Sequence, residues 1–428
     1  MIVKDGVSTL ARCLTSVRGV VDRIVIGDTG SADDSVSIAK EFGAEIISVP
    51  WQGDFSSARN AVLRQSKCDW ILVMDADEML DPDAAVALAK ITQNPEIAAY
   101  DVWRWNYVLQ TNSRSGEHGA LTNPRKLKEA SAYPAYVKSL NTRLFRRNPE
   151  VYFERPVHET VSYRLQCLRL PVDTAPFVIH HFGQAEDHEA DRRRKNELYQ
   201  QIGLEHLRHY PEDARTCFEL GLGELEHYQR PEPALKLFLK AVQINPKDSN
   251  SLLFAGICLI RLQRLPEALQ MLLRSAAIDP QSAVLHEALG DAHFHQGAYA
   301  EALLAYIKAQ TLGSSSALVL AKRGVCEIYG GKNDSGILHL QEALHQEPDF
   351  PELFDLAATG AALARENRFA AEIAQKRLAL PGASAFHYEL ASVLFRLASE
   401  IDVSHAVIAQ GLAKFPDNPA LLAQREVL

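Results

Sequence analysis

The sequence predicts an α/β domain followed by an all-α repeat solenoid, and two observations carry this prediction. In roughly the first 80 residues, short apolar runs alternate with helix-like segments, and all four tryptophans lie in the first quarter of the 428-residue chain. Beyond about residue 212, the chain is rich in alanine and leucine, and small residues and prolines recur at a fixed period. A chain of this length usually folds as two or more domains, in agreement with this change of pattern.

Three apolar runs in the first half predict strands, and helix-like segments separate them. Ser31 is expected to cap a helix that runs to about Phe42 and ends at Gly43, and Asp54 is expected to cap the next helix. Strands that alternate with helices and are apolar throughout are typical of a parallel sheet covered on both faces. The three runs are RIVIG (23–27), EIISV (45–49) and WILVM (70–74).

Acidic residues follow two of these strands directly. Asp28 follows the first, and Asp75, Asp77 and Glu78 follow the third. Ligands of parallel sheets bind beyond the carboxyl ends of the strands, so these carboxylates should face one crevice. Asp75 and Asp77 are suitable ligands for Mg²⁺ or Mn²⁺, which would neutralise a diphosphate leaving group. The alternative is that the acids only favour the first turn of a helix.

A 34-residue period organises the second half. The prolines at this spacing are Pro246, Pro280, Pro348 and Pro416. One column of small residues is Ala234, Ala268, Ala302, Gly336, Ala370 and Ser404, and a second is Gly256, Gly290, Gly324, Ala358 and Ser392. Small residues at fixed spacing let paired helices pack closely, and the pattern resembles about six tetratricopeptide repeats (TPR). Arg377 interrupts a further column of alanines. Such an array offers a concave surface for a peptide or protein, although a plain scaffold is the alternative.

The composition excludes several classes of protein. The formal net charge of −9 argues against a nucleic-acid partner held through phosphate contacts. No apolar run approaches the roughly 18 residues of a membrane helix, and the N-terminus lacks the shape of a signal peptide. The six cysteines are scattered without a CxxC motif, which is typical of free thiols in a reducing compartment. We therefore expect a cytoplasmic protein without an integral membrane segment.

An ordered series of blocks resembles the family 2 glycosyltransferases, in particular the branch of the sublancin-type peptide glycosyltransferases and their TPR-fused relatives. The blocks are MIVKDG, VDRIVIGDTGSADDS, GAEIISVPWQGDFSSARN, CDWILVMDADEML, TRLFRR (142–147), RPVHE (155–159) and IHHFG (179–183). The resemblance covers roughly residues 1–200. It predicts a GT-A domain over residues 1–185, a connecting helix over 186–211 and the repeats over 212–428.

The resemblance implies inverting, metal-dependent transfer from a nucleotide sugar, most often a UDP-sugar, to an acceptor. With the repeats attached, the acceptor is expected to be a protein or peptide. The residues expected to bind substrate are Asp28, Asp54, Arg59, Asn60, Asp75 and Arg143. The expected ligands of Mn²⁺ or Mg²⁺ are Asp75, Asp77 and His181, with His180 as the alternative to His181. An inverting transfer needs a base, for which Glu159 is the first candidate and His158 the second.

Two departures from the family pattern leave a second function open. Several residues normally precede MIVK, so the first strand is expected to be shortened at Met1, and KDG (4–6) stands where KNE is usual. The alternative function is therefore a TPR adaptor with a vestigial glycosyltransferase domain. A nucleotidyltransferase would also use paired acids on a parallel sheet, but it would need a glycine-rich basic loop near the first strand, and the sequence has none.

Overall fold

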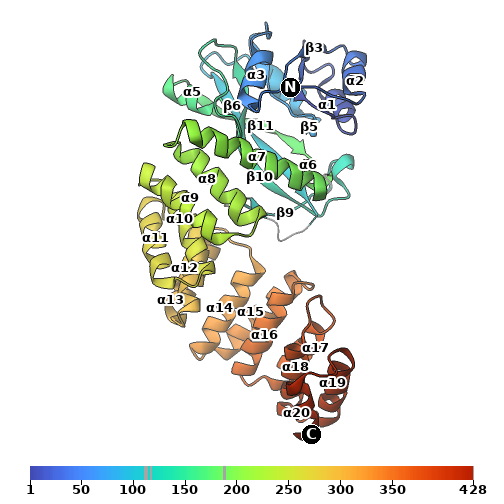
Figure 1. Ribbon diagram of the computed structural model, residues 1–428, viewed down its shortest axis with the longest axis vertical. Coiled ribbons are helices and arrows are strands. Elements are labelled where there is room, and N and C mark those ends of the chain that lie inside the picture. The colour runs from blue at the N-terminus through green and yellow to red at the C-terminus, as the bar shows by residue number, and fades with distance from the viewer. Residues whose placement is uncertain (110–113, 116–117, 187–188, 428) are drawn as a thin grey trace. The chain divides into compact units, whose positions relative to one another are not determined.

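Figure 1 shows the computed structural model, which describes residues 1–109, 114–115, 118–186 and 189–427. The chain forms two compact units, Met1–Gln229 and Arg230–Leu428, and each is described on its own. The predicted fold class is confirmed, because sheets and helices alternate in the first unit and the second is an array of helices. The domain limits at residues 185 and 211 stay predictions. Within the described residues, no helix combines the length and apolar character needed to span a bilayer.

The first unit begins with a three-stranded parallel sheet in the order β1-β2-β3. In its register Val3 pairs with Asp28 and Asp28 with Ser48, so the carboxyl ends of the strands lie side by side. This part confirms the predicted alternation of strand and helix. Its elements are β1 (Ile2–Val3), α1 (Leu10–Val17), β2 (Val25–Asp28), α2 (Ser35–Glu41), β3 (Glu45–Ser48) and α3 (Phe55–Leu63).

The second sheet has six strands and is less parallel than predicted. Its order is β4-β10-β6-β11-β5, with β9 paired to β10, and only the β11–β6 pair is parallel. The third predicted strand, β4, therefore joins this sheet by antiparallel pairing with β10. Its partner is far away in the sequence, and a local apolar pattern carries no information about it. The strands are β4 (Trp70–Leu72), β5 (Glu78–Leu80), β6 (Ala99–Val108), β9 (Leu121–Thr122), β10 (Ala135–Arg146) and β11 (Val172–His181).

Short elements and two longer helices complete the first unit. Helix α7 continues the chain after β11 and α6, and α8 follows it. The remaining elements are α4 (Ala84–Ile91), β7 (Arg114–Ser115), β8 (His118–Gly119), the 3-10 helix η1 (Lys128–Ala130), α5 (Ser162–Cys167), α6 (Gly183–Glu186), α7 (Glu189–His209), α8 (Ala214–Leu222) and the π-helical turn η2 (Gly223–His227).

Helix α1 joins the cores of the two sheets. Its buried residues Leu10, Cys13, Leu14 and Val17 follow the three- and four-residue spacing of one helix face. Leu10 and Leu14 pack with β1 and β2, whereas Cys13 and Val17 pack with the core beneath β5 and β6. The Cys13 thiol also donates to the carbonyl oxygen of Asp75 at 3.3 Å. The acidic turn between β4 and β5 is thus tied to α1.

The predicted helix ends were right at two positions and wrong at one. Asp54 caps α3 by accepting a hydrogen bond from the Ser57 amide at 2.9 Å. Gly43 follows the end of α2 with φ of 74°. Ser31 does not cap α2, which begins further along the chain. Its hydroxyl instead accepts a hydrogen bond from the Asp5 amide at 3.0 Å, because the loop before α2 is bonded to the loop after β1.

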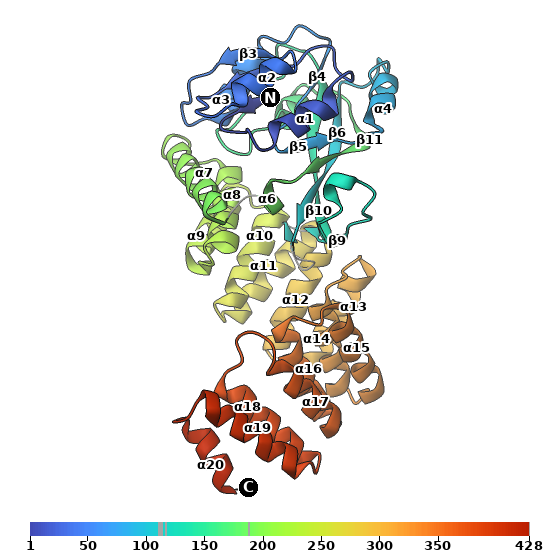
Figure 2. The same cartoon turned by 90° about the vertical axis from the view of Figure 1, so that its right-hand side faces the viewer.

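The second unit confirms the predicted repeat packing (Figure 2). Its helices form successive antiparallel pairs, and every member of the two small-residue columns is buried. A Cβ atom at Gly290 would overlap the ring of the fully buried Tyr306. The helices are α9 (Pro231–Ile244), α10 (Ser249–Arg261), α11 (Leu265–Ile278), α12 (Ala283–His295), α13 (Tyr299–Thr311), α14 (Ala317–Tyr329), α15 (Asn333–Gln346), α16 (Pro351–Leu363), α17 (Asn367–Arg377), α18 (Ala385–Leu397), α19 (Ile401–Lys414) and α20 (Pro419–Val427).

The irregular residue Arg377 has a structural explanation. It stands where other repeats carry a small residue, yet its guanidinium is buried. Its Nε donates to Asp355 at 3.0 Å, and its Nη1 donates to the carbonyl oxygen of Pro381 at 3.2 Å. A charge can be buried when it is paired and hydrogen-bonded in this way. The repeat therefore replaces apolar packing with a local ion pair.

Candidate functional site

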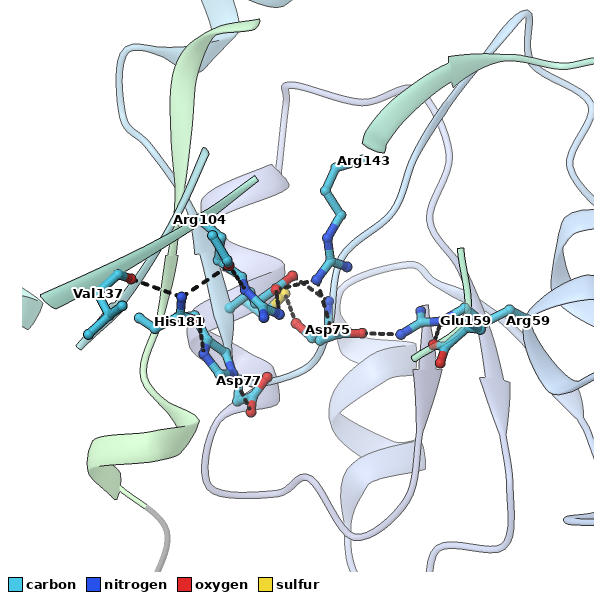
Figure 3. A network of polar contacts seen from close by, with 12 residues as sticks. Arg59, Asp75, Asp77, Arg104, Val137, Arg143, Glu159 and His181 are labelled. Carbon is cyan, nitrogen blue, oxygen red and sulfur yellow. Dashed lines mark hydrogen bonds and ion pairs between the residues drawn. The ribbon is translucent and has the colours of Figure 1, made fainter. Parts of the chain in front are cut away.

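A network of charged residues lies at the acidic turn between β4 and β5 (Figure 3). The carboxylate of Asp75 accepts a hydrogen bond from Nη2 of Arg59 at 2.5 Å and from Nη2 of Arg143 at 3.1 Å. Arg59 also donates through Nε to Glu159, and Arg143 donates to Glu78 at 2.7 Å. The structure thus brings together four of the predicted site residues, from α3, the turn, β10 and the RPVHE loop.

The network is largely shielded from water. The side chains of Arg59 and Arg143 are 10% and 9% exposed, and that of Asp75 is 27% exposed. Burial alone would raise the pKa of Asp75, but the two arginines outweigh it and hold the pKa well below its usual value. Burial would lower the pKa of Arg59, and Asp75 and Glu159 raise it instead. Asp75, Arg59 and Arg143 are therefore charged at neutral pH, and Asp75 faces two guanidinium groups.

The network has two further members. The sequence placed Glu78 only among the acids that follow the third strand, and it did not single out Arg104. Glu78 is completely buried and accepts from the Asp75 amide at 2.8 Å, from Arg143, and from Arg104 at 3.3 Å. Arg104 lies between Trp103 and Trp105 in β6. A charged residue inside an apolar strand signals a buried partner, and this was the signal that could have identified Arg104.

Asp77 lies beside His181, which ends β11. Oδ2 of Asp77 is 3.2 Å from Nε2 of His181, and Nδ1 of His181 is 2.9 Å from Oδ1 of Asn106. The amide nitrogen of Asn106 donates to Val137 and Ser139, so its oxygen faces the histidine. Nδ1 therefore donates to Asn106, and Nε2 is the ring nitrogen that faces Asp77. A proton on Nε2 joins the two groups in an ion pair, and a metal ion would take the place of that proton.

The neighbouring His180 points elsewhere. Its Nδ1 is 2.9 Å from the Tyr107 hydroxyl and its Nε2 is 3.2 Å from Asp81. Burial lowers the pKa of His180 although Asp81 opposes this. Burial would raise the pKa of Asp77, but the interaction with His181 lowers it to about 2. Because successive strand residues face opposite sides, only His181 reaches the acidic turn.

The chemistry of Asp77 and His181 fits a hard divalent cation. Mg²⁺-type ions are bound through one or two protein groups and retain water or phosphate oxygens. A Cβ atom at Gly183 would clash with Asp77 Oδ2 and lie 3.0 Å from His181 Nε2, so the glycine keeps space open there. Within the described ranges, no three His, Cys, Asp or Glu side chains form a metal-binding group. Asp75 is turned to the arginines, and its role as a ligand stays a prediction.

The RPVHE loop carries both candidate bases. It is closed by an antiparallel bridge in which the amides of Glu154 and Thr160 bond to each other's carbonyl oxygens at 3.1 and 3.3 Å. The Glu159 side chain is 12% exposed and is held by Arg59. His158 is half-exposed and lies 3.8 Å from Glu219 of α8. Of the two, the structure directs Glu159 into the network.

Three predicted substrate-binding residues make other contacts. Asp28 accepts from the Ser31 amide at 3.1 Å, and Asp54 caps α3. Asn60 donates to the carbonyl oxygen of Phe153 and accepts from its amide, both at 2.8 Å. Asn60 therefore tethers the segment that leads into the RPVHE loop. Substrate binding by Asp28, Asp54 and Asn60 stays a prediction.

Comparison with known families identifies the two parts of the chain. Residues 1–151 match the model of glycosyl transferase family 2, and residues 228–292 match that of the tetratricopeptide repeat. The chain thus carries an N-terminal family 2 glycosyltransferase domain followed by TPR repeats. The family 2 resemblance of the sequence blocks and the repeats indicated by the 34-residue period are both confirmed.

Curated relatives agree with this division. A TPR repeat-containing protein of Synechococcus elongatus is 33% identical over 258 residues, which cover 55% of this chain and 58% of that protein. The SPbeta prophage-derived glycosyltransferase SunS of Bacillus subtilis is 26% identical over 273 residues, which cover 62% of this chain and 58% of SunS. The chain therefore spans 58% of the length of each. The solved structure of PilW, a type IV pilus biogenesis factor, matches 49% of this chain and 97% of PilW at 19% identity. Its TM-score of 0.44 is too low for the match to bear on function.

Proposed function

We propose that this chain is an inverting glycosyltransferase that transfers a sugar from a nucleotide sugar, in the form of a UDP-sugar, to a protein or peptide acceptor. The observation that carries the proposal is the convergence of Asp77 and His181 with the Asp75–Arg59–Glu159 network in a family 2 domain. The acidic turn follows the carboxyl end of β4 and faces His181 at the carboxyl end of β11. The TPR array supports recruitment of a polypeptide, because such repeats present extended binding surfaces.

Asp77 and His181 are proposed to hold Mn²⁺ or Mg²⁺. When bound, the cation supplies positive charge that stabilises a departing diphosphate. Asn106 keeps Nδ1 of His181 protonated and so leaves Nε2 available as a ligand. Asp75 holds Arg59 and Arg143 in place next to this site. These two arginines are proposed to donate hydrogen bonds to the bound diphosphate.

Glu159 is proposed to act as the base. The acceptor oxygen forms a bond to the anomeric carbon of the sugar as its proton passes to the Glu159 carboxylate. The bond from that carbon to the diphosphate breaks, and the nucleoside diphosphate leaves on the opposite face. Attack from the face opposite the leaving group inverts the configuration. Arg59 orients Glu159 through its ion pair and keeps the carboxylate facing the acidic turn.

Calorimetric titration of UDP with and without Mn²⁺ tests the cation site. We expect Mn²⁺ to strengthen UDP binding to the wild-type chain. The Gly183→Ala substitution should remove most of this gain, because its methyl group would occupy the space beside Asp77 and His181. The loss should be at least about tenfold in affinity, comparable with losses at disturbed metal sites.

Gly119→Ala is the matched control, because a Cβ atom at Gly119 meets no atom within 4 Å. This variant should bind UDP and Mn²⁺ as the wild type does. Equal Mn²⁺ dependence in Gly183→Ala and the wild type would refute the cation site at Asp77 and His181. A folded wild-type chain that binds no UDP under any condition would favour the adaptor function.

A further inference from the structure

The loop that carries Glu159 has an unusual backbone. Arg155 and His158 adopt φ angles of 78° and 52°, in the left-handed region that residues other than glycine seldom occupy. Such a residue persists only where surrounding contacts maintain it. The bridge between Glu154 and Thr160 closes the loop at its base. The contacts at its tip must therefore come from elsewhere in the first unit.

Helices α7 and α8 supply these contacts at both strained residues. Nε of Arg155 lies 3.9 Å from Asp213 at the start of α8, and Nε2 of His158 lies 3.8 Å from Glu219. The ring of Tyr199 in α7 packs edge-on to the ring of His158, with centroids 5.8 Å apart. The loop tip is thus held between two acidic side chains and one aromatic ring.

Tyr199 also links the loop to α3. Its ring packs edge-on to Phe55 at 5.6 Å, and the Phe55 amide donates to the carbonyl oxygen of Pro156 at 2.9 Å. Burial raises the pKa of Tyr199, Lys195 opposes this, and the nearby carboxylate of Glu159 adds to the increase. The phenol therefore lies close to the charged network as well as to the loop.

The two helices are themselves firmly connected. Asp213 caps α8 by accepting from the amides of Arg215 and Thr216 at 3.0 and 3.1 Å, and His206 of α7 lies 3.1 Å from the same carboxylate. Further along, α7 and the π-helical turn η2 are joined by a hydrogen bond from Gln200 to the Glu224 carboxylate at 2.8 Å. These contacts make the α7–α8 pair a rigid support for the loop.

We propose that α7 and α8 position the catalytic base, with Tyr199 and Glu219 as positioning residues that act through His158 on Glu159. The proposal rests on the proposed function, since it takes Glu159 as the base. Both helices lie beyond residues 1–151, which match the glycosyltransferase family. The segment predicted as a mere connector and the helix predicted to begin the repeats then support the loop that carries the proposed base.

The test compares Tyr199→Ala and Glu219→Gln with the wild type in the full-length chain. Hydrogen–deuterium exchange of the amides in residues 151–161 reports the loop directly and needs no activity. UDP release from a UDP-sugar with water as acceptor reports turnover, and calorimetry reports UDP affinity. We expect severalfold faster exchange in the loop and roughly tenfold lower kcat, because displaced catalytic groups lose rate steeply. UDP affinity should stay within about twofold, since neither side chain is proposed to contact the donor.

Three control variants separate positioning from a loss of structure. Tyr199→Phe keeps the ring and should retain activity. Arg215→Gln removes the other ion pair of Glu219, and Glu197→Gln changes a residue whose side chain is 48% exposed. These should behave as the wild type. When His158 is already replaced by Gln, the added Glu219→Gln substitution should have no further effect on loop exchange or kcat. The effects of substituting two contacting residues that act together are not additive.

Each outcome decides the proposal. Unchanged exchange in the loop, or faster exchange with unchanged kcat, would overturn it. A loss of kcat matched by an equal loss of UDP affinity would also overturn it, because the helices would then serve donor binding. If the wild type turns over no UDP-sugar, the proposed function fails, and the exchange experiment still decides whether α7 and α8 hold the loop.

Discussion

Glu159→Gln is expected to lower the rate of sugar transfer by about 10²- to 10⁴-fold, the range that a positioned general base contributes. Glutamine preserves the size of the side chain and a contact with Arg59, but it cannot accept the proton of the acceptor. Because the donor diphosphate is proposed to bind at Asp77 and His181, UDP affinity should change little. Stopped-time assays of UDP release and UDP calorimetry measure the two quantities separately.

Two variants in the same loop serve as controls for this prediction. Glu154→Gln changes an acid whose backbone closes the loop but whose side chain is not part of the charged network. It should retain nearly full activity. His158→Gln tests the second candidate base and should cost less than Glu159→Gln. A Glu159→Gln variant that keeps more than half of the wild-type rate would show that Glu159 is not the base.

Asp75→Ala is expected to reduce the free energy of unfolding by about 3–5 kcal/mol, the usual effect of removing one partner from a buried ion pair. The substitution leaves Arg59 and Arg143, which are 10% and 9% exposed, without the carboxylate between them. Urea unfolding at neutral pH, followed by circular dichroism, measures the change. Asp28→Ala, which removes a hydrogen bond from one backbone amide, should lower stability by only about 1 kcal/mol.

The pH dependence of this effect has a definite sign. The folded-state pKa of Asp75 lies well below its usual value, so its contribution is fully present above the ordinary aspartate pKa. The contribution is lost as the pH falls towards the depressed folded-state value. The stability difference between the wild type and Asp75→Ala should therefore shrink in acid. A difference below about 1 kcal/mol at neutral pH would show that water screens the pair as it does at a surface.

The periodic features of the chain were predictable from the sequence. Apolar runs indicated strands β2, β3 and β4, and the 34-residue spacing indicated the paired helices of the second unit. Residues that are favoured at helix ends likewise predicted the cap at Asp54 and the helix end at Gly43. The cap at Ser31 was wrong, because its hydroxyl bonds to the amide of Asp5, which is distant in sequence. Contacts between separate segments are not visible in local propensities.

The same limit applies to the site. Ordered blocks in the sequence identified Arg59, Asp75, Arg143 and Glu159 as site residues, and the structure brings these four together. The sequence blocks did not show that the Asp75 carboxylate is shared by two arginines. This depends on strand β10 lying beside β4, which only the three-dimensional fold determines.

The arrangement of the candidate metal ligands could not be read from the sequence for a similar reason. The spacing of Asp75 and Asp77 suggested two ligands for one cation, yet only Asp77 faces His181. The orientation of His181 is determined by Asn106 in β6, a polar residue that carries no recognisable motif. The choice between His180 and His181 depends on which face of β11 meets the acidic turn. That choice needs the register of β11 against β5 and β6.

Release of UDP from a panel of UDP-sugars by the wild-type chain, in Mn²⁺ and in EDTA, tests most directly whether the acidic turn serves glycosyl transfer. We predict release from at least one sugar donor in Mn²⁺, little release in EDTA, and its loss in Glu159→Gln. A folded wild-type chain that releases UDP from no donor, in either condition, would contradict glycosyl transfer at this site and leave the chain as a TPR adaptor.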